Sequence, residues 1–303
     1  MAVPIVRPTL GGDLMPREIV ADIFSKAERQ SVVQQIAQRQ PLSSTGAVIP
    51  VVTGTPSAGW VSEAGRKPVS DMTLGSKLLE PKKLAVIVPF SKEYLRDTSI
   101  DLLGILRPKI AEAFAISFDA ASIKGTSTPF STFIYQTTNT VEAGTSAATA
   151  GGLHQDLVNA LGTVADEGKS YRVTDWVFDD TFEVRILGAR DAQGNSTFLD
   201  SPTNDGGPVG RILGRPVRYT NQAATGATAQ NRGFGVDASQ IAYGISQDIQ
   251  YDISNQASIV LADGTTVLHL WQNNLVALLA ETELAFVMND VQAAVRVADA
   301  TAG

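Results

Sequence analysis

The chain of 303 residues contains no cysteine and only two histidines, His154 and His269. The lack of cysteine excludes disulfides, thiolate metal sites and cysteine nucleophiles. The two histidines lie far apart in the sequence, so they indicate neither a catalytic pair nor a metal cluster. We therefore expect no cofactor and no metal, and we expect stability to come from packing or from assembly.

Long apolar runs and catalytic motifs are also missing. No stretch approaches the roughly 20 apolar residues of a membrane-spanning helix, and Met1–Leu10 lacks the basic and apolar regions of a secretion signal, so we expect a cytoplasmic protein without membrane contact. The strings G-x-S-x-G, G-x-x-x-x-G-K-[ST] and H-E-x-x-H are absent, which predicts no enzyme. The segment from Asp191 to Asn195 resembles a calcium loop only superficially, and its turn-forming residues predict a turn.

The net charge of −7 is unevenly distributed along the chain. Residues 1–93 carry 11 Lys and Arg against 8 Asp and Glu, and residues 94–303 carry 13 against 23. Without clustered Lys and Arg, the acidic body argues against tight binding of duplex nucleic acid. The asymmetry suits a basic front segment that lies on acidic bodies of neighbouring copies, although a random excess of surface acid explains it equally well.

The first half of the chain alternates helical and extended patterns. Residues 13–39 carry an amphipathic stripe that includes Ile19, Ile23 and Phe24, which predicts a helical arm. Residues 47–52 and 74–90 are typical of strands, and the polar stretch between them predicts an exposed loop tip around Trp60. We interpret residues 45–90 as a two-stranded excursion, and because a lone hairpin is marginally stable, we expect it to rest on a neighbouring subunit.

The longest helical pattern covers residues 91–124 and ends at Gly125. A second domain begins near residue 150, with a helix from Leu153 to Gly168 and a strand at 173–178. Asp180 and Glu183 predict a capping box for a helix through residue 189, and the turn-rich residues 191–210 predict an exposed loop. Further strands are expected at 211–220, 241–253, 266–272 and 276–286. The class is α+β, without the βαβ repeat of a parallel sheet.

Four stretches in this order resemble the major capsid proteins of tailed bacteriophages that share the Hong Kong 97-type shell fold. They cover the loop tip, the entry to the long helix, the end of that helix and a series of strand and turn motifs in the second domain. These are Gly59–Glu63 with Pro68–Ser70, Val88–Thr98, Asp119–Pro129, and Val173–Asp180 with Leu187–Gly194 and Ile212–Val217.

The resemblance implies a particular division of the chain. Residues 1–44 would form an N-terminal arm, 45–90 an extended loop, 91–140 with 269–303 a peripheral domain built on a spine helix, and 141–268 an axial domain. Copies would form hexamers and pentamers of an icosahedral head that encloses double-stranded DNA. The virion capsid would assemble in the host cytoplasm.

The same resemblance implies the partners of the chain. They are other copies of itself, a portal protein and a candidate decoration protein, with packaged DNA contacted only weakly and without sequence specificity. Many relatives carry a long scaffolding region at the N-terminus, whereas only residues 1–44 precede the loop here. Scaffolding is therefore expected from a separate polypeptide.

Candidate interface residues follow from these assignments. In the extended loop they are Trp60, Glu63, Arg66, Lys67 and Lys77, where Trp60 could instead pack in its own hairpin and the charges could be a solvated loop. In the arm they are Ile19, Ile23 and Phe24. A loop at the ring centre would contain Asp200, Asn204 and Asp205, with an outer-surface loop as the alternative.

Some relatives join subunits by an isopeptide bond between Lys and Asn with the help of a Glu. Lys67 or Lys77, Asn289, and Glu281 or Glu283 could supply these groups, although no motif aligns them. Two further functions stay open at the level of sequence. They are the shell protein of an encapsulin-type bacterial compartment, which uses the same fold, and a monomeric enzyme.

Overall fold

The computed structural model describes residues 30–52, 56–63, 65–70, 72–93, 102–165, 171–195, 210–225, 231–261 and 263–300. The chain divides into two compact units. One contains the described residues of Lys82–Phe118 and Gln247–Leu284, and the other contains those of Val32–Pro81, Asp119–Ser246 and Ala285–Gly303. The predicted arm residues Ile19, Ile23 and Phe24 and the predicted ring-centre residues Asp200, Asn204 and Asp205 lie outside the described residues.

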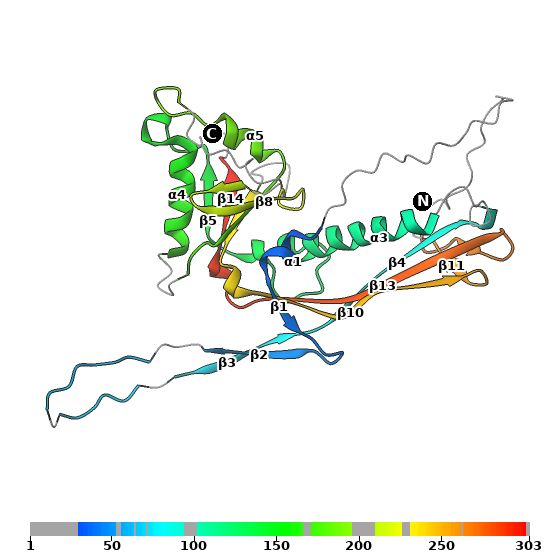
Figure 1. Ribbon diagram of the computed structural model, residues 1–303, viewed down its shortest axis with the longest axis horizontal. Coiled ribbons are helices and arrows are strands. Elements are labelled where there is room, and N and C mark those ends of the chain that lie inside the picture. The colour runs from blue at the N-terminus through cyan, green and yellow to red at the C-terminus, as the bar shows by residue number, and fades with distance from the viewer. Residues whose placement is uncertain are drawn as a thin grey trace. The chain divides into compact units, whose positions relative to one another are not determined.

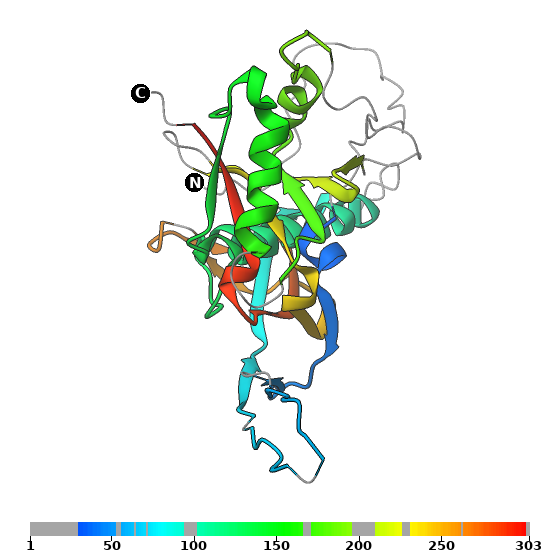
Figure 2. The same ribbon diagram turned by 90° about the vertical axis from the view of Figure 1, so that its left-hand side faces the viewer.

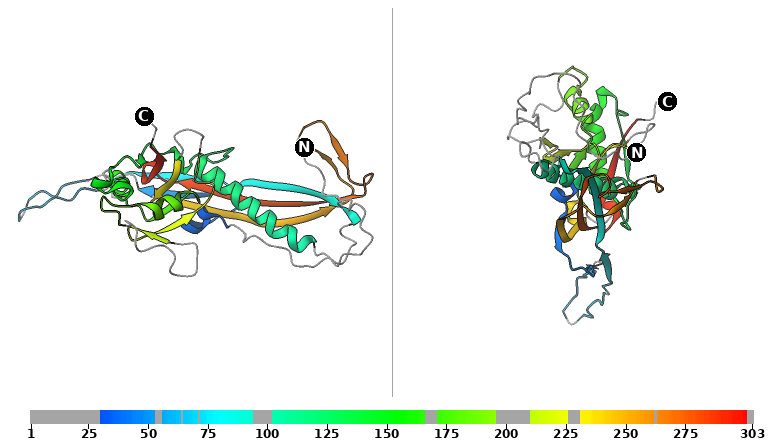
Figure 3. Two further views of the ribbon diagram at one scale, coloured as in Figure 1. Left: turned by 90° about the horizontal axis from the view of Figure 1, so that it is seen from above. Right: turned by 90° about the vertical axis from the view of Figure 1, so that its right-hand side faces the viewer.

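The first unit is a helix packed on long strands (Figure 3). Helix α3 (Leu102–Asp119) lies along β4 (Lys82–Ser91), β10 (Ile241–Ser254) and β13 (Leu275–Met288). Strand β13 pairs antiparallel with β4, from Leu275 opposite Ser91 to Leu284 opposite Lys82. Alternate residues of β13 face the helix and form a buried cluster with its side chains and with β4, made of Val276, Leu278, Ala280, Phe90, Ile110 and Phe114. The alternation predicted for residues 276–286 is thus confirmed as a strand.

A small hairpin completes the first unit. Strands β11 (Ser258–Val260) and β12 (Val267–His269) pair antiparallel. Their inner side chains, Ile259 and Leu268, pack against buried Leu270 and Leu275. The predicted strand at 266–272 therefore ends early, because residues 270–274 form the turn that leads into β13.

The second unit is built around a six-stranded sheet with the order β5-β14-β9-β6-β8-β7. Helix α4 lies across one face of this sheet (Figure 2). The bounds are β5 (Thr140–Ala143), β6 (Asp175–Phe178), β7 (Gly210–Ile212), β8 (Arg215–Tyr219), β9 (Asn231–Val236), β14 (Ala294–Asp299), α4 (Gly152–Ala165) and α5 (Phe182–Gly188).

The core of this sheet domain is dense and aromatic. Trp176, Phe178 and Phe182 are fully buried, with ring centroids 5.6 Å apart for Trp176–Phe178 and 4.9 Å apart for Phe178–Phe182. Such stacked pairs add to the stabilisation that burial alone gives. The helix predicted from Leu153 is confirmed as α4, whose Leu157 and Val164 close the core.

A clamp joins the end of α3 to the short helix α1 (Val32–Ile36). The buried carboxylate of Asp119 accepts hydrogen bonds from the backbone amides of Val32, at 2.9 Å, and Val33, at 3.2 Å. A π-helical turn, Ala120–Lys124, follows, and Gly125 ends it with φ +73°. The predicted stop at Gly125 is thus confirmed, because this left-handed conformation favours glycine.

Three further strands of the second unit lie before β4 in the chain. Strand β1 (Gln38–Pro41) pairs parallel with β10, and β2 (Ala47–Val52) pairs antiparallel with β3 (Leu74–Leu79) (Figure 1). The predicted extended segment 47–52 is confirmed as β2. Single helical turns occupy Ile134–Gln136, Ala148–Ala150, Ala238–Gln240 and Val291–Ala293.

Several predicted boundaries are wrong. The helix predicted over residues 13–39 cannot include Gln38 and Arg39, which belong to β1. Within the excursion predicted over residues 45–90, β2 pairs with β3, and β4 pairs with β13; its bounds stay a prediction. The strand predicted at 211–220 is a hairpin, because Leu213 and Gly214 turn with positive φ.

Two further predictions concern local turns. Asp180 does not cap α5, because that helix begins at Phe182 and it is Asp179 whose carboxylate accepts from the amide of Thr181 at 3.3 Å. The predicted turn at Asp191 is confirmed. Its carboxylate accepts from the amide of Asn195 at 2.7 Å, and the hydrogen bond from the Asn195 side chain is the main cause that lowers the pKa of Asp191.

The strand pairing joins segments that are distant in sequence. Strand β14 lies in the six-stranded sheet although it comes last in the chain, and β10 lies in a four-stranded sheet with β1, β13 and β4. The division into residues 141–268 and 269–303 stays a prediction.

Candidate assembly surfaces

The hairpin of β2 and β3 presents one side of its ladder entirely to solvent. Residues that are directly opposite in an antiparallel pair share a face, and here Val48 pairs with Leu78, and Val52 with Leu74. All four are exposed, with exposed fractions of 63% for Val48 and 66% for Leu74. Within the described chain, this apolar face has nothing packed on it. We call it the outer face of the hairpin.

The opposite side of the hairpin is anchored at its root. Leu79 is fully buried against Ala285 and Val287, and Ala47 and Ile49 pack on the same cluster. The root turns sharply at Gly46, where φ is +95° and a Cβ would lie 2.9 Å from the Leu79 carbonyl oxygen. The hairpin is therefore fixed at one end, and its outer face is presented from a firm base.

The loop tip between β2 and β3 is also exposed. Trp60 has no packing partner that covers it, and Val69 is 88% exposed. Glu63, Arg66 and Lys67 are exposed, and the described part of the chain holds no ion pair for any of the three. The structure thus brings all of the predicted tip residues to one exposed segment, and it confirms the exposed loop tip. Their predicted contacts with another subunit stay a prediction.

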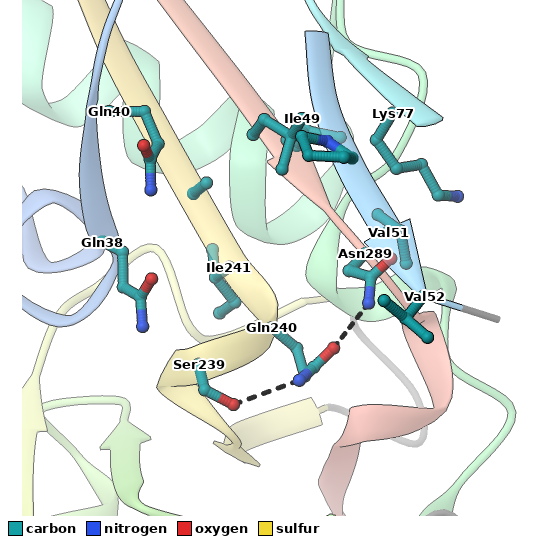
Figure 4. A pocket seen from close by; sticks show the side chains of 13 residues that line it. Gln38, Gln40, Ile49, Val51, Val52, Lys77, Ser239, Gln240, Ile241 and Asn289 are labelled. Atoms are coloured by element: carbon teal, nitrogen blue, oxygen red, sulfur yellow. Dashed lines mark hydrogen bonds between the residues drawn. The ribbon is translucent and has the colours of Figure 1, made fainter. Parts of the chain in front are cut away.

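A groove of about 270 Å³ lies beside the hairpin root (Figure 4). Gln38 and Gln40 of β1 line one side, and Ile49 and Val51 of β2 line the other. At one end the Asn289 amide donates to Gln240 Oε1 at 2.7 Å. Sequence reasoning missed this groove, because its walls come from five segments that only the fold brings together: β1, β2, β3, residues 239–242 and the end of β13.

The groups predicted for an isopeptide bond are only partly brought together. Lys77 and Asn289 line the same groove, but the Lys77 ammonium points away from its floor (Figure 4). Glu281 is ion-paired with Lys83 at 2.6 Å. Lys67 lies in the loop tip, and Glu283 lies on β13. A covalent link among these residues stays a prediction.

Three further points about the described residues concern metal-ligand groups, membrane-spanning helices and histidines. They contain no group of three or more His, Asp and Glu side chains that could hold a metal ion. No helix among them is long and apolar enough to cross a bilayer. His269 Nδ1 lies 2.8 Å from the Ser258 hydroxyl across the small β11–β12 hairpin, far from any second histidine in sequence.

The described chain combines a long helix packed on long strands with a sheet domain and a two-stranded hairpin. Solved structures agree. The chain of Mycobacterium phage Adephagia matches with a TM-score of 0.78 at 20% identity, covering 96% of both chains. The capsid of a native GTA particle with C5 symmetry matches with a TM-score of 0.72 at 19% identity, covering 97% of this chain and 98% of the other. The fold is therefore the Hong Kong 97-type capsid fold.

The sequence comparisons define the particular family. The phage capsid family matches residues 11–298. The probable major capsid protein gp17 of Mycobacterium phage L5 is 36% identical over 303 residues, covering 96% of this chain and 90% of the relative. The chain belongs to the phage capsid family and is a major capsid protein, a structural component of the virion that assembles with copies of itself.

Proposed function

We propose that the hairpin is the extended loop through which copies join into hexamers and pentamers, and that these rings build an icosahedral head around double-stranded DNA. The outer face of the hairpin carries the proposal. Val48, Val52, Leu74 and Leu78 are exposed together on one side of a two-stranded ladder. Contiguous apolar patches on soluble proteins mark interaction sites, and a two-stranded hairpin gains stability when something covers a face.

The remaining interface residues support the same arrangement. Trp60 is the kind of large aromatic side chain that anchors an interface, and Glu63, Arg66 and Lys67 lack ion-pair partners in the described chain. We infer that Trp60 and these charges contact a neighbouring subunit. Lys77 contributes from the hairpin itself, and Ile19, Ile23 and Phe24 of the arm make further apolar contacts between subunits.

We also propose roles for the two sheets. The sheet of β4, β10 and β13 with α3 serves as the peripheral domain, and the six-stranded sheet with α4 and α5 serves as the axial domain. The loop with Asp200, Asn204 and Asp205 would then lie near the centre of each ring. An Asn204→Cys variant should cross-link copies within one ring. The cross-link can be assigned to this position because the native chain has no cysteine. Labelling from outside without cross-links would contradict this placement.

The other partners are proposed from the net charge and from the family resemblance. A net charge of −7 supports only weak, non-specific contact with DNA. A separate scaffolding protein, a portal protein and a candidate decoration protein follow from the family resemblance, and so does assembly in the host cytoplasm. Pull-down of co-expressed structural proteins, followed by mass spectrometry, would identify which of these bind.

Electron microscopy of the purified chain tests the central proposal. We expect closed shells with fivefold and sixfold rings, and nuclease-protected DNA in particles taken from infected cells. Limited proteolysis serves as the control that the hairpin is intact. A chain that has an intact hairpin and still stays monomeric would overturn the proposal. Particles that contain a cargo protein in place of DNA would instead favour a compartment.

A further inference from the structure

The groove beside the hairpin root has binding groups that the chain itself does not use. The side-chain amides of Gln38 and Gln40 line it, and neither has a hydrogen-bond partner within the described residues. Ile49, Val51, Ile241 and Val287 supply an apolar surface, and Lys77 lies at the rim without an ion pair in the described chain. The groove thus combines amides, an apolar wall and one cation.

This combination defines the chemistry of a ligand. Side-chain amides can donate to a peptide carbonyl and accept from a peptide amide, the apolar wall suits an aromatic ring, and an ammonium suits a carboxylate. At about 270 Å³ the groove is slightly smaller than the roughly 300 Å³ at which small-molecule sites begin. It therefore suits one large side chain and the adjoining backbone of an extended peptide.

The chain carries such a peptide at the loop tip. In the segment Gly59–Glu63, Trp60 is fully exposed, and Glu63 is exposed with no ion-pair partner in the described residues. Glu63 lies in a turn closed by the Gly65 amide and the Ser62 carbonyl, so it is at most about 10 Å from Trp60 along the backbone. An indole in the groove would place the Glu63 carboxylate near the rim. Figure 1 shows that the segment beyond β2 and β3 extends away from β1, which lines the groove, so the peptide must come from another copy.

We propose that the groove of one subunit receives Gly59–Glu63 of a second copy. Trp60 packs on the half-buried Ile49 and Val51, and the peptide backbone bonds to the amides of Gln38 and Gln40. The Glu63 carboxylate pairs with Lys77. The inference rests on the proposed function, because it assumes that hairpins of different copies meet in a shell. A tip-to-root contact is head-to-tail, so a closed ring fills every groove.

A cysteine pair tests this contact directly. In shells of a Ser62→Cys, Gln40→Cys variant, mild oxidation should give a ladder of reducible multimers on a denaturing gel, whereas either single variant should give at most dimers. A matched pair of Ser62→Cys with Asn159→Cys, an exposed position on α4, should give no ladder. Shells that form without a ladder in the first variant would overturn the inference and leave the proposed function intact. Wild-type protein that forms no shells would contradict the proposed function itself.

A charge exchange gives a second, independent test. Glu63→Lys and Lys77→Glu should each raise the protein concentration needed for assembly about fivefold, and the double variant should restore it. Single effects that are not reversed by the double variant would overturn the pairing.

Fluorescence quenching tests the burial of Trp60. In Trp271→Phe shells, which keep Trp60 and buried Trp176, acrylamide should no longer quench Trp60. Quenching equal to that of the unassembled subunit would also overturn the proposal.

Discussion

The six-stranded sheet domain and the β2–β3 hairpin are both rich in apolar side chains, but only the domain buries them. Trp176, Phe178 and Phe182 have no exposed surface and stack on one another. In the hairpin, Val48 and Leu74 are more than 60% exposed, and Trp60 is fully exposed. The core of the domain is completed by its own chain, whereas we propose that the hairpin is completed when another copy covers it.

This difference is not visible in the local apolar pattern. The hairpin strand Ala47–Val52 (AVIPVV) is as apolar as the core strand Asp175–Phe178 (DWVF). What separates them is the number of layers above each strand, because β6 is covered on both faces and β2 on one. Four experiments probe the contrast, and the expected effect decreases from the first to the last.

Removing the hairpin should abolish assembly and leave the subunit folded. Deletion of residues 54–77 takes away most of β3 and the whole loop tip, but it spares Leu79, which anchors the root. Because the buried core residues of both units lie outside the deleted segment, far-ultraviolet circular dichroism should change little. Sedimentation should show no particles. Loss of the fold would mean that the hairpin stabilises the subunit itself, and the contrast would fail.

A cavity in the sheet domain should lower the stability of the unassembled subunit. Phe178→Ala removes a ring that stacks on both Trp176 and Phe182, and such substitutions cost about 3–5 kcal/mol. The matched variant Val48→Ala, on the outer face of the hairpin, should change the free energy of unfolding by less than about 0.5 kcal/mol. Thermal unfolding of unassembled protein checks both, and equal losses would contradict the comparison.

The clamp at Asp119 should have an intermediate effect. Its carboxylate accepts two backbone amides of α1 while it is buried, so Asp119→Ala leaves two donors without this partner. We expect a loss of about 1–3 kcal/mol in the free energy of unfolding. Asp119→Asn keeps the shape and one acceptor oxygen, and it should lose less. Urea titration measures the two variants, and an equal loss would show that the charge itself is essential.

The sequence predicts elements well where the signal is local. Gly125 ends its helix with a left-handed conformation, and the alternation at 276–286 becomes β13. Prediction from sequence fails where a strand pairs with one that is distant in the chain. Strand β1 (QRQP) has no apolar period and exists only because it pairs with β10, about 200 residues later in the chain. The hairpin of β7 and β8 has a single glycine, Gly214, as the local signal of its turn, and the prediction treated the segment as one strand.

The candidate site shows the same division. Trp60, Glu63, Arg66 and Lys67 are predictable from sequence as an exposed tip, because polar and turn-forming residues surround them. The groove is not predictable, since Gln38, Ile49, Gln240 and Asn289 meet only through the packing of the hairpin root on the sheet. The partner of the Asp119 carboxylate lies 87 residues away and has no sequence signature.

The smallest effect is expected at the ion pair between Lys83 and Glu281. The pair has ideal contact distance, 2.6 Å, but the Lys83 side chain is 54% exposed, so solvent screens it. Lys83→Ala and Glu281→Ala should each cost at most about 1 kcal/mol of the free energy of unfolding in the unassembled subunit.

Assembly is the sharper readout for Glu281, because this residue is a predicted isopeptide group. If contacts between copies are non-covalent, boiled wild-type shells should give one band near 32.0 kDa on a denaturing gel. A ladder that Glu281→Gln removes, with subunit stability unchanged, would prove a covalent link and give this residue a role in assembly.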